Sequence, residues 1–384
     1  MNILFVRSPY TFQVDGTNLK QARCRLYLWN EPNILPTAPT YEFYFYPPTP
    51  TQTKGYFNIS NECLEFINPT FPNTYTTYNS QESNNHWCYA KVVLEWASAL
   101  EDPEWEEAEG SGLTYICVNG YTEYTQGRNF AISNVFSYTL MNSIYPVINS
   151  FAEDDYYKNI PNVNTIYPYV DILIDNIMDE DPPFLYYLQY IYLDGSVSNV
   201  YQLTLLTPKV QMIRIPLRDL SMSRTKPYYV TLYKYDVQND IETQEISYII
   251  NPLCTPKYPV QELSFINKLG GWEFLYCMGN SEEKVDMTNT DYRFAQPFNY
   301  DIHVGQRQTF NTNGKKSIKV NTGWVPERTK ILIEQLLFSE TILIDKVPVV
   351  LKTKNSVLKK TLKEKMINYT FEFEYKFNAI NNVI

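Results

Sequence analysis

Aromatic and aliphatic side chains recur at every second position in many short runs of this sequence. The clearest run covers 368–377, where five aromatic rings fall on one side, namely Tyr369, Phe371, Phe373, Tyr375 and Phe377. An earlier run, Arg23–Trp29, alternates in the same way. Because successive side chains of a β-strand point to opposite faces, this period of two indicates strands that bury one face. The 34 Tyr, 20 Phe and 6 Trp of the chain agree with a mainly β fold, since aromatic rings suit a pleated surface.

Turns rich in proline and asparagine divide the predicted strands into three modules. Residues 1–130 are expected to form an N-terminal β-sandwich and residues 131–253 a second β-sandwich, both of fibronectin- or immunoglobulin-like type. Strands are predicted in the first at 23–29, 41–45, 56–59, 87–96 and 113–118, and in the second at 184–192, 201–206, 210–215, 228–235 and 246–250. The segments 57–60, 88–96 and 113–118 resemble 213–216, 228–236 and 246–250 in pattern and spacing. This likeness fits either a tandem duplication or the general similarity of any two sheet domains.

The third module, 254–384, is expected to be a β-rich α+β module with one helix. Proline breaks helices and sheet ladders, so Pro252, Pro256 and Pro259 mark its start. The helix is predicted at about 326–339, because Pro326 and Glu327 both suit a first helical turn. Strands are expected at 261–266 and 273–277 around a turn at 268–271, and also at 341–344, 347–351 and 368–377. Asn313-Gly314 is a type I′ hairpin signal between 308–312 and 316–320.

Charge is distributed unevenly along the chain, whose formal net charge is −10. Residues 1–250 hold 14 basic and 28 acidic side chains, a net charge of −14, whereas residues 251–384 hold 18 and 14, a net charge of +4. Complementary fields of this kind steer association and would favour copies that meet head to tail. The other interpretation is that both halves are ordinary solvated surfaces. The acidic balance argues against a nucleic-acid partner.

The six cysteines are scattered, with no Cys-x-x-Cys pair and no framework spacing. The first ten residues do not resemble a signal peptide, since their short apolar run is followed by Arg7 and Pro9. No apolar run reaches the length that spans a bilayer, so no membrane partner is expected. These features predict reduced thiols in a protein that folds in the cytoplasm.

Residues that usually carry chemistry are sparse. The two histidines, His86 and His303, lie in no metal-ligand or triad spacing, and the sequence contains no phosphate-binding glycine motif. No catalytic residue, metal or cofactor is therefore expected. Two acidic runs remain, Glu101–Glu109 and Asp179–Asp181, and they are interpreted as solvated loop tips. The alternatives are calcium binding and the paired-carboxylate chemistry of a glycosidase. Trp105, inside the first acidic run, is a candidate for contact with a sugar ring or a protein partner.

Three blocks of the third module carry a family resemblance. The first is the segment 265–274, Phe-Ile-Asn-Lys-Leu-Gly-Gly-Trp-Glu-Phe, and the second is 305–325, which contains Thr-Phe-Asn-Thr-Asn-Gly-Lys-Lys and Val-Asn-Thr-Gly-Trp. A third block combines 335–340, 351–354 and 367–373. Together they resemble a family of virion proteins of phages and prophages of Bacteroidota, including crAss-like phages. The resemblance is dense over about 260–384 and looser over the first 250 residues.

The resemblance implies a non-enzymatic structural subunit of the virion neck or tail. We expect it to form a ring or collar through contacts with copies of itself and with neighbouring portal, neck or tail proteins. The motif residues are interpreted as turn and core residues of the third module: Phe265, Asn267, Gly270, Trp272, Phe310, Asn313, Gly314, Asn321, Gly323 and Trp324. Two other functions stay open: a tail tip protein that binds a receptor or glycan, and a virion-associated glycosidase.

Overall fold

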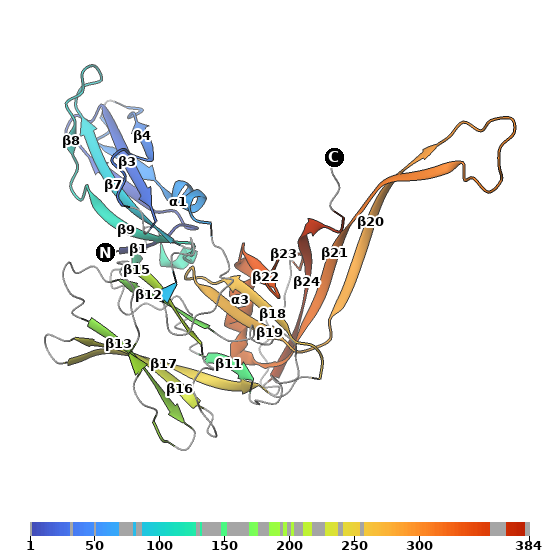
Figure 1. The fold of residues 1–384 in the computed structure, drawn as a ribbon. Helices are drawn as coiled ribbons and strands as arrows, with labels where there is room; N and C mark the ends of the chain where they lie inside the picture. Colours follow the sequence, from blue (N-terminus) through green and yellow to red (C-terminus); the bar gives the residue numbers. More distant parts are fainter. Residues whose placement is uncertain are drawn as a thin grey trace. The chain divides into compact units, whose positions relative to one another are not determined.

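The computed structural model describes residues 2–30, 34–49, 51–68, 80–81, 87–127, 131–132, 147–151, 169–175, 184–192, 195–197, 201–202, 210–216, 227–236, 241–253, 257–353 and 366–380. The fold is mainly β, as the alternating pattern predicts (Figure 1). The chain forms two compact units. The first consists of Met1–Thr255 with Ile266–Glu273, and the second of Pro256–Phe265 with Phe274–Ile384. The three-module boundaries at 130 and 253 stay a prediction.

The N-terminal part of the first unit is a β-sandwich. Its larger sheet has the strand order β10-β1-β9-β7-β3-β4, with β8 paired to β7, and its smaller sheet pairs β2 with β5. These strands are β1 (Asn2–Phe5), β2 (Thr11–Asp15), β3 (Gln21–Trp29), β4 (Tyr41–Phe45), β5 (Lys54–Asn58), β7 (Trp87–Ala97), β8 (Glu106–Glu107), β9 (Leu113–Val118) and β10 (Ala131–Ile132). All five strands predicted for 1–130 are present, with ends within two residues of the expected ones.

The core of this sandwich follows from the alternation in the sequence. Along β3 the residues Cys24, Leu26 and Leu28 are buried, while the side chains between them are partly exposed. They join Val14 and Phe57 of the smaller sheet in one apolar cluster. A short helix, α1 (Ser60–Phe66), which the strand pattern did not indicate, adds the buried Cys63 to this cluster. A one-turn 3-10 helix, η1 (Tyr124–Gln126), follows the sandwich.

The second half of the first unit repeats the same strand topology. Its sheet order is β11-β17-β16-β13-β14, which matches β1-β9-β7-β3-β4 strand for strand, and the first strand pairs in parallel with the last in both sheets. A second sheet, β12-β15-β6, repeats the β2-β5 pair and gains β6. The strands are β6 (Ser80–Gln81), β11 (Val147–Phe151), β12 (Tyr169–Asp175), β13 (Phe184–Tyr192), β14 (Tyr201–Gln202), β15 (Val210–Pro216), β16 (Pro227–Asp236) and β17 (Ile241–Leu253).

This repeat confirms the internal likeness seen in the sequence. The three segment pairs compared there fall on β5 and β15, on β7 and β16, and on β9 and β17, which hold equivalent places in the two sheet orders. Parallel pairing of a first strand with a last strand is a specific topological feature, because most sheet neighbours here are antiparallel. Two immunoglobulin-like sandwiches in tandem, as predicted, account for this shared topology.

The second unit is built on one sheet with the strand order β19-β18-β22-β23-β24-β21-β20. Its elements are β18 (Gln261–Ile266), β19 (Trp272–Cys277), β20 (Glu282–Arg293), β21 (Arg307–Pro326), η4 (Glu327–Thr329), α3 (Lys330–Phe338), β22 (Ile342–Ile344), β23 (Val347–Leu351) and β24 (Met366–Asn378). The helix predicted at 326–339 is confirmed as η4 and α3, with Ile333 and Leu336 fully buried. Alternate residues of β24 are buried from Ile367 to Phe373, also as predicted.

The hairpin predicted for this unit at Asn313-Gly314 is wrong. Asn313-Gly314 does not turn the chain, because β21 runs through both residues without a break. Gly314 lies opposite Met287 of β20, and a Cβ on it would stand 2.9 Å from the carbonyl oxygen of Asp286. The glycine is therefore needed for a close approach of two strands and not for a positive φ. The hairpin turn lies instead at 294–306, between β20 and β21.

Candidate interaction surfaces

The first motif segment, Ile266–Glu273, forms a tight connection between β18 and β19. Asn267 is fully buried, and its Oδ1 accepts the backbone N–H groups of Leu269 at 2.9 Å and Gly271 at 3.0 Å. Its own N–H donates to the carbonyl of Gly271 at 2.8 Å, and Gly270 has a φ of +90° that favours glycine. The prediction that these residues form a turn is confirmed.

This turn packs within the first unit, on the outer face of the N-terminal sheet. Leu269 covers an apolar cluster that consists of Ile3, Phe5, Trp87, Tyr89, Ile116 and Val118, with Trp29 beside it. The N–H of Tyr121 donates to the carbonyl of Lys268 at 2.9 Å, and the Lys268 ammonium lies 2.6 Å from Glu123. That hydrogen bond from Lys268 lowers the pKa of Glu123. Segments about 150 residues apart in the sequence thus meet in one contact, which has a polar part at Tyr121 and Glu123 and an apolar part at Leu269.

Glycines make that contact possible. A Cβ on Gly120 would lie 2.7 Å from the Lys268 carbonyl, and a Cβ on Gly270 would lie 3.1 Å from both the Asn119 nitrogen and Val118. Phe265, Trp272 and Phe274 are all buried, so the prediction that they are core residues is confirmed. The first motif is therefore structural, and its surface is already occupied by the chain itself.

The second motif ends in a bulge next to β24. The Oδ1 of Asn321 accepts the N–H of Gly323 at 2.7 Å, and its Nδ2 donates to Asn368 and Thr370 of β24. The register between β21 and β24 shifts here, and Gly323 has a φ of +71°. Trp324, which was predicted to be a turn or core residue, directly follows this register shift and is 65% exposed.

The outer halves of β20 and β21 form a protruding ribbon, named here the arm (residues 288–312). Arg307–Phe310 pair only with Thr290–Arg293 among the described residues, whereas β24 joins β21 from Lys315 onward. Figure 1 shows the arm extending beyond the rest of its sheet. Every residue of β20 is exposed. Phe310, predicted to be a core residue, lies on the arm and is exposed, so that prediction is wrong.

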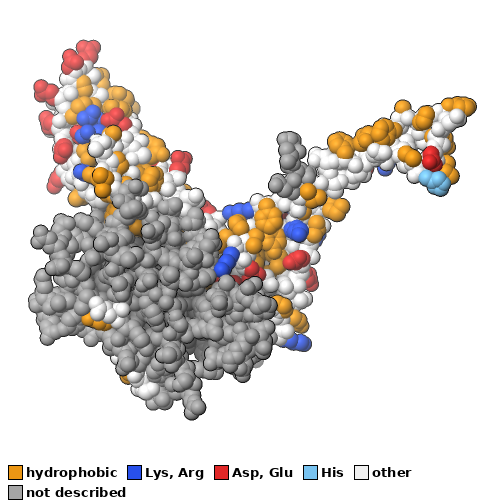
Figure 2. Space-filling view, viewed as in Figure 1, with side chains coloured by type: hydrophobic (Ala, Val, Ile, Leu, Met, Phe, Trp, Pro, Cys, Tyr) orange, Lys and Arg blue, Asp and Glu red, His pale blue; other side chains and the backbone are white. Residues whose placement is uncertain are grey.

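Apolar side chains are concentrated on the arm despite its exposure (Figure 2). Tyr292 contacts the rings of Phe294 and Phe310, with ring centroids 4.9 Å and 5.4 Å away. The connection 294–306, named here the arm tip, holds one carboxylate, Asp301, and no lysine or arginine. Its large exposed hydrophobic residues are Phe294, Phe298, Tyr300, Ile302 and Val304. An exposed apolar group of this size is typical of an interaction surface.

A groove lies at the base of the arm, where β21 leaves β24. It is lined by Lys315, Val350, Glu374, Tyr375, Lys376, Phe377 and Asn378. Lys315 and Lys352 bind the two carboxylate oxygens of Glu374 at 2.9 Å and 2.6 Å. The hydrogen bonds from Lys352 and then from Lys315 lower the pKa of Glu374, so this carboxylate stays ionised between the two ammonium groups. Val350 pairs with Glu374 and lies on the same face of the sheet as this ion-pair cluster, whereas Tyr375 points to the opposite face and packs against the core.

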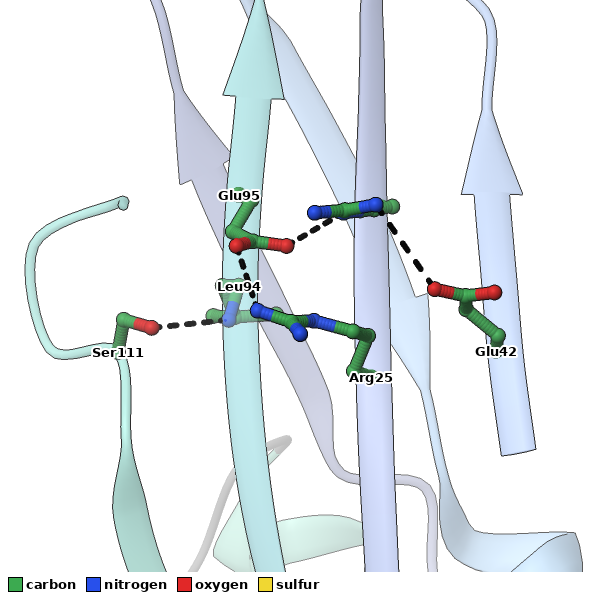
Figure 3. A network of polar contacts seen from close by, with 6 residues as sticks. Arg25, Glu42, Leu94, Glu95 and Ser111 are labelled. Atoms are coloured by element: carbon green, nitrogen blue, oxygen red, sulfur yellow. Dashed lines mark hydrogen bonds and ion pairs between the residues drawn. The ribbon is translucent and has the colours of Figure 1, made fainter. Parts of the chain in front are cut away.

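A polar network covers the outer face of the N-terminal sheet around β3 and β7 (Figure 3). Glu95 is buried and lies between the guanidinium groups of Arg23 and Arg25, the latter at 2.6 Å. Arg23 also lies 3.9 Å from Glu42, and its guanidinium stacks over the Trp105 ring at 4.2 Å. Trp105, expected as a contact residue, is therefore partly covered by this intramolecular stacking.

The first acidic run lies at the surface. Glu101, Glu106 and Glu109 are exposed, and in the part of the chain that the structure describes no three His, Cys, Asp or Glu side chains are grouped to hold a metal ion. His303 is exposed on the arm tip. The second acidic run, Asp179–Asp181, and His86 lie outside the described residues.

The cysteines within the described ranges are all free and buried, namely Cys24, Cys63, Cys88, Cys117 and Cys277. Burial raises the pKa of Cys24 to about 12 and raises that of Cys277 further. The thiol of Cys117 lies 3.7 Å from the sulfur of Cys63, inside the first core. Thiols in this environment are protonated and unreactive, which assigns them to packing.

Comparison with protein-family models, with curated proteins and with solved structures gives no match. Within the described residues, no helix has both the length and the apolar character needed to cross a membrane. The interaction surfaces therefore have to be interpreted from their own geometry. Sequence reasoning located the two motifs but missed the arm, whose only sequence signal is a nearly uncharged apolar stretch at 294–306 that looks like core.

Proposed function

We propose that the chain is a non-enzymatic structural subunit of a bacteriophage virion, built into the neck or tail, where it forms part of a ring or collar. The arm is the observation that carries this proposal. A two-stranded ribbon is marginally stable alone in water, and an exposed apolar tip costs solubility, so both features favour a protein that is completed by assembly. The resemblance of 265–274 and 305–325 to virion proteins of Bacteroidota phages supports the same conclusion.

The tandem sandwiches fit this function. Two modules of the first unit share one strand topology, and the acidic first 250 residues differ in charge from the remaining 134. Parts of unlike charge favour heterologous contacts, which close into a ring when the rotation between neighbours allows it. Neighbouring portal, neck or tail proteins then contact the two rims of that ring.

The position of the chain in the particle tests the proposal. Virions of the phage that encodes the chain would be purified and imaged by cryo-electron microscopy. Mass spectrometry of the same particles would identify the chain. We expect density for the sandwiches and the arm in a symmetric ring around the tail axis. Particles that lack the chain, or that carry it only as a single copy at the tail tip, would contradict the proposed function.

A further inference from the structure

One face of the outer arm is aromatic. Phe310 pairs with Thr290, and Tyr292 pairs with Gln308. Because residues two apart in a strand point to the same side of a sheet, Tyr292 and Phe310 share a face, in agreement with their ring contact at 5.4 Å. Phe294 lies two residues beyond Tyr292, with its ring 4.9 Å away, and continues this face toward the arm tip. These three rings, named here the aromatic face, are each between 40% and 48% exposed.

The opposite face of the same ribbon is charged. Arg293 pairs directly with Arg307, and Asp291 pairs with Thr309, whose hydroxyl donates to its carboxylate at 2.8 Å. The ribbon is therefore amphipathic, with one side that favours water and one that does not. A sheet of this kind buries its apolar side against a second layer. No second layer covers the arm among the described residues, since all of 288–311 is exposed.

The charge of the arm favours another copy of itself as the missing layer. Residues 288–312 hold two aspartates and two arginines, so their net charge is zero. Two arms therefore do not repel each other, and their aromatic faces match in size and polarity. A lipid surface is a poorer match, because peripheral membrane segments use lysine and arginine to bind anionic headgroups. The arm tip has neither residue and carries the carboxylate of Asp301.

The area of the arm is sufficient for a specific contact between two copies. Seven large exposed hydrophobic side chains lie on the outer arm: Tyr292, Phe294, Phe298, Tyr300, Ile302, Val304 and Phe310. At roughly 100 Å² for each, about half the surface of an aromatic side chain, one arm offers about 700 Å². Two arms would then bury about 1,400 Å², within the range of specific protein–protein interfaces. The aromatic face supplies less than half of this area, so the arm tip has to take part.

We infer that the arms of two copies pack aromatic face against aromatic face, as the two layers of a small β-sandwich related by a two-fold axis. Tyr292, Phe294 and Phe310 of one copy lie against the same three residues of the other, the two tips lie side by side, and both charged faces stay in water. Four strands in two layers stabilise ribbons that are marginal alone. The contact joins copies in pairs, so it goes beyond the head-to-tail contacts of the proposed ring and does not depend on them.

The first test compares the two faces of the arm in the purified full-length chain. Sedimentation velocity over a range of concentrations would measure dimer formation. The double variant Phe294→Ser with Phe310→Ser should weaken the dimer about thirtyfold or more, as expected for hot-spot side chains. The matched control, Asp291→Ser with Arg293→Ser, changes the charged face, keeps the net charge of the arm at zero and should leave the dimer unchanged.

The same measurement at several salt concentrations separates an apolar contact from a charged one. The whole chain has a net charge of −10, so added salt screens the repulsion between copies and should leave the dimer unchanged or strengthen it. A dimer that dissociates as salt is added, or one that tolerates the Phe294→Ser, Phe310→Ser variant, would overturn the inference. All four substituted side chains are exposed, so matching thermal unfolding curves will show that both variants keep the fold.

Cysteine crosslinking establishes which faces meet. The experiment uses the Cys254→Ser chain, in which the five remaining native cysteines are buried. A two-fold contact brings a residue near its own copy, so Phe310→Cys alone should give a dimer with a short bis-maleimide. Thr309→Cys, on the opposite face of the ribbon, should give none. No dimer from Phe310→Cys, or equal yields from the two positions, would overturn the face-to-face contact.

A lipid surface is the competing partner for an apolar arm. Vesicles of phosphatidylethanolamine and phosphatidylglycerol would be sedimented with the wild-type chain and with the Phe294→Ser, Phe310→Ser variant. Binding that the variant loses, from a chain that stays monomeric at all concentrations, would overturn the inference in favour of a membrane. The proposed function fails separately: a chain that forms arm-linked dimers but is absent from virions overturns the function alone, and a monomeric chain found in the virion ring overturns the contact alone.

Discussion

Two connections in the same stretch of chain, 266–273 and 294–306, end in opposite environments. The first joins β18 to β19 and the second joins β20 to β21, and both are rich in large apolar residues. The first is buried on the N-terminal sheet, where Leu269 covers an apolar cluster. The second leaves Phe298, Tyr300 and Ile302 in solvent. The difference teaches that apolar content alone does not determine where a connection lies.

The polar groups explain the difference. In the buried connection Asn267 accepts two backbone N–H groups, and the Lys268 carbonyl accepts a third from Tyr121. Gly120 and Gly270 let the two backbones approach closely. The arm tip has a local turn, in which Asp301 accepts the N–H of His303 at 2.9 Å and the N–H of Val304 donates to the Asp301 carbonyl at 3.1 Å. A connection is buried only where its backbone groups find partners as well.

Trp272→Ala should show the largest contrast between the two connections. Removal of this fully buried ring leaves a cavity, and we expect a loss of about 4 kcal/mol in the free energy of unfolding. Phe298→Ala on the arm tip should change it by less than about 0.5 kcal/mol, since that ring is exposed. Equilibrium urea unfolding followed by circular dichroism measures both. Equal losses would mean that the tip is packed against its own chain.

A pair of glycine substitutions should show an intermediate effect. Gly270→Ala adds a Cβ at a φ of +90° and within 3.1 Å of backbone, so we expect a loss of about 2 kcal/mol. Gly305→Ala meets only the Arg307 carbonyl at 3.4 Å and has no positive φ, so the free energy should stay within about 0.5 kcal/mol. The midpoints of thermal unfolding compare the two. A neutral Gly270→Ala would contradict the close approach described here.

The ion pair of Lys268 with Glu123 should have the smallest effect. The pKa of Glu123 is lowered in the folded chain, so its contribution is present above the unfolded-state pKa and is lost as pH falls through the folded value. Glu123 is largely exposed, and solvent screening keeps the contribution at about 0.5 kcal/mol or less. Glu123→Gln should therefore remove a small pH dependence of stability below about pH 4.3. A wild-type stability that rises as pH falls through this range would reverse the predicted sign.

Much of the fold was predictable because strand periodicity is local. The alternation at Arg23–Trp29 and at 368–377 indicated β3 and β24, and the pattern at 326–339 indicated η4 and α3. The misses concern residues whose role depends on distant neighbours. Asn313-Gly314 has the chemistry of a turn, but pairing with β20 on one side and with Ala379 at the Gly314 carbonyl on the other holds it in a strand. No local rule separates these outcomes.

The sequence by itself determined the mainly β class, most strand positions, the C-terminal helix and the likeness between the two sandwiches. Side-chain period, proline and helix-start residues are enough for that, because each acts within a few residues. Only the tertiary structure decided which apolar residues are buried. Phe265 and Phe310 are the same residue type in adjacent motifs, yet one is fully buried and the other lies on the exposed arm. Burial requires a complementary surface with satisfied backbone groups, and such a surface forms only when segments distant in the sequence meet.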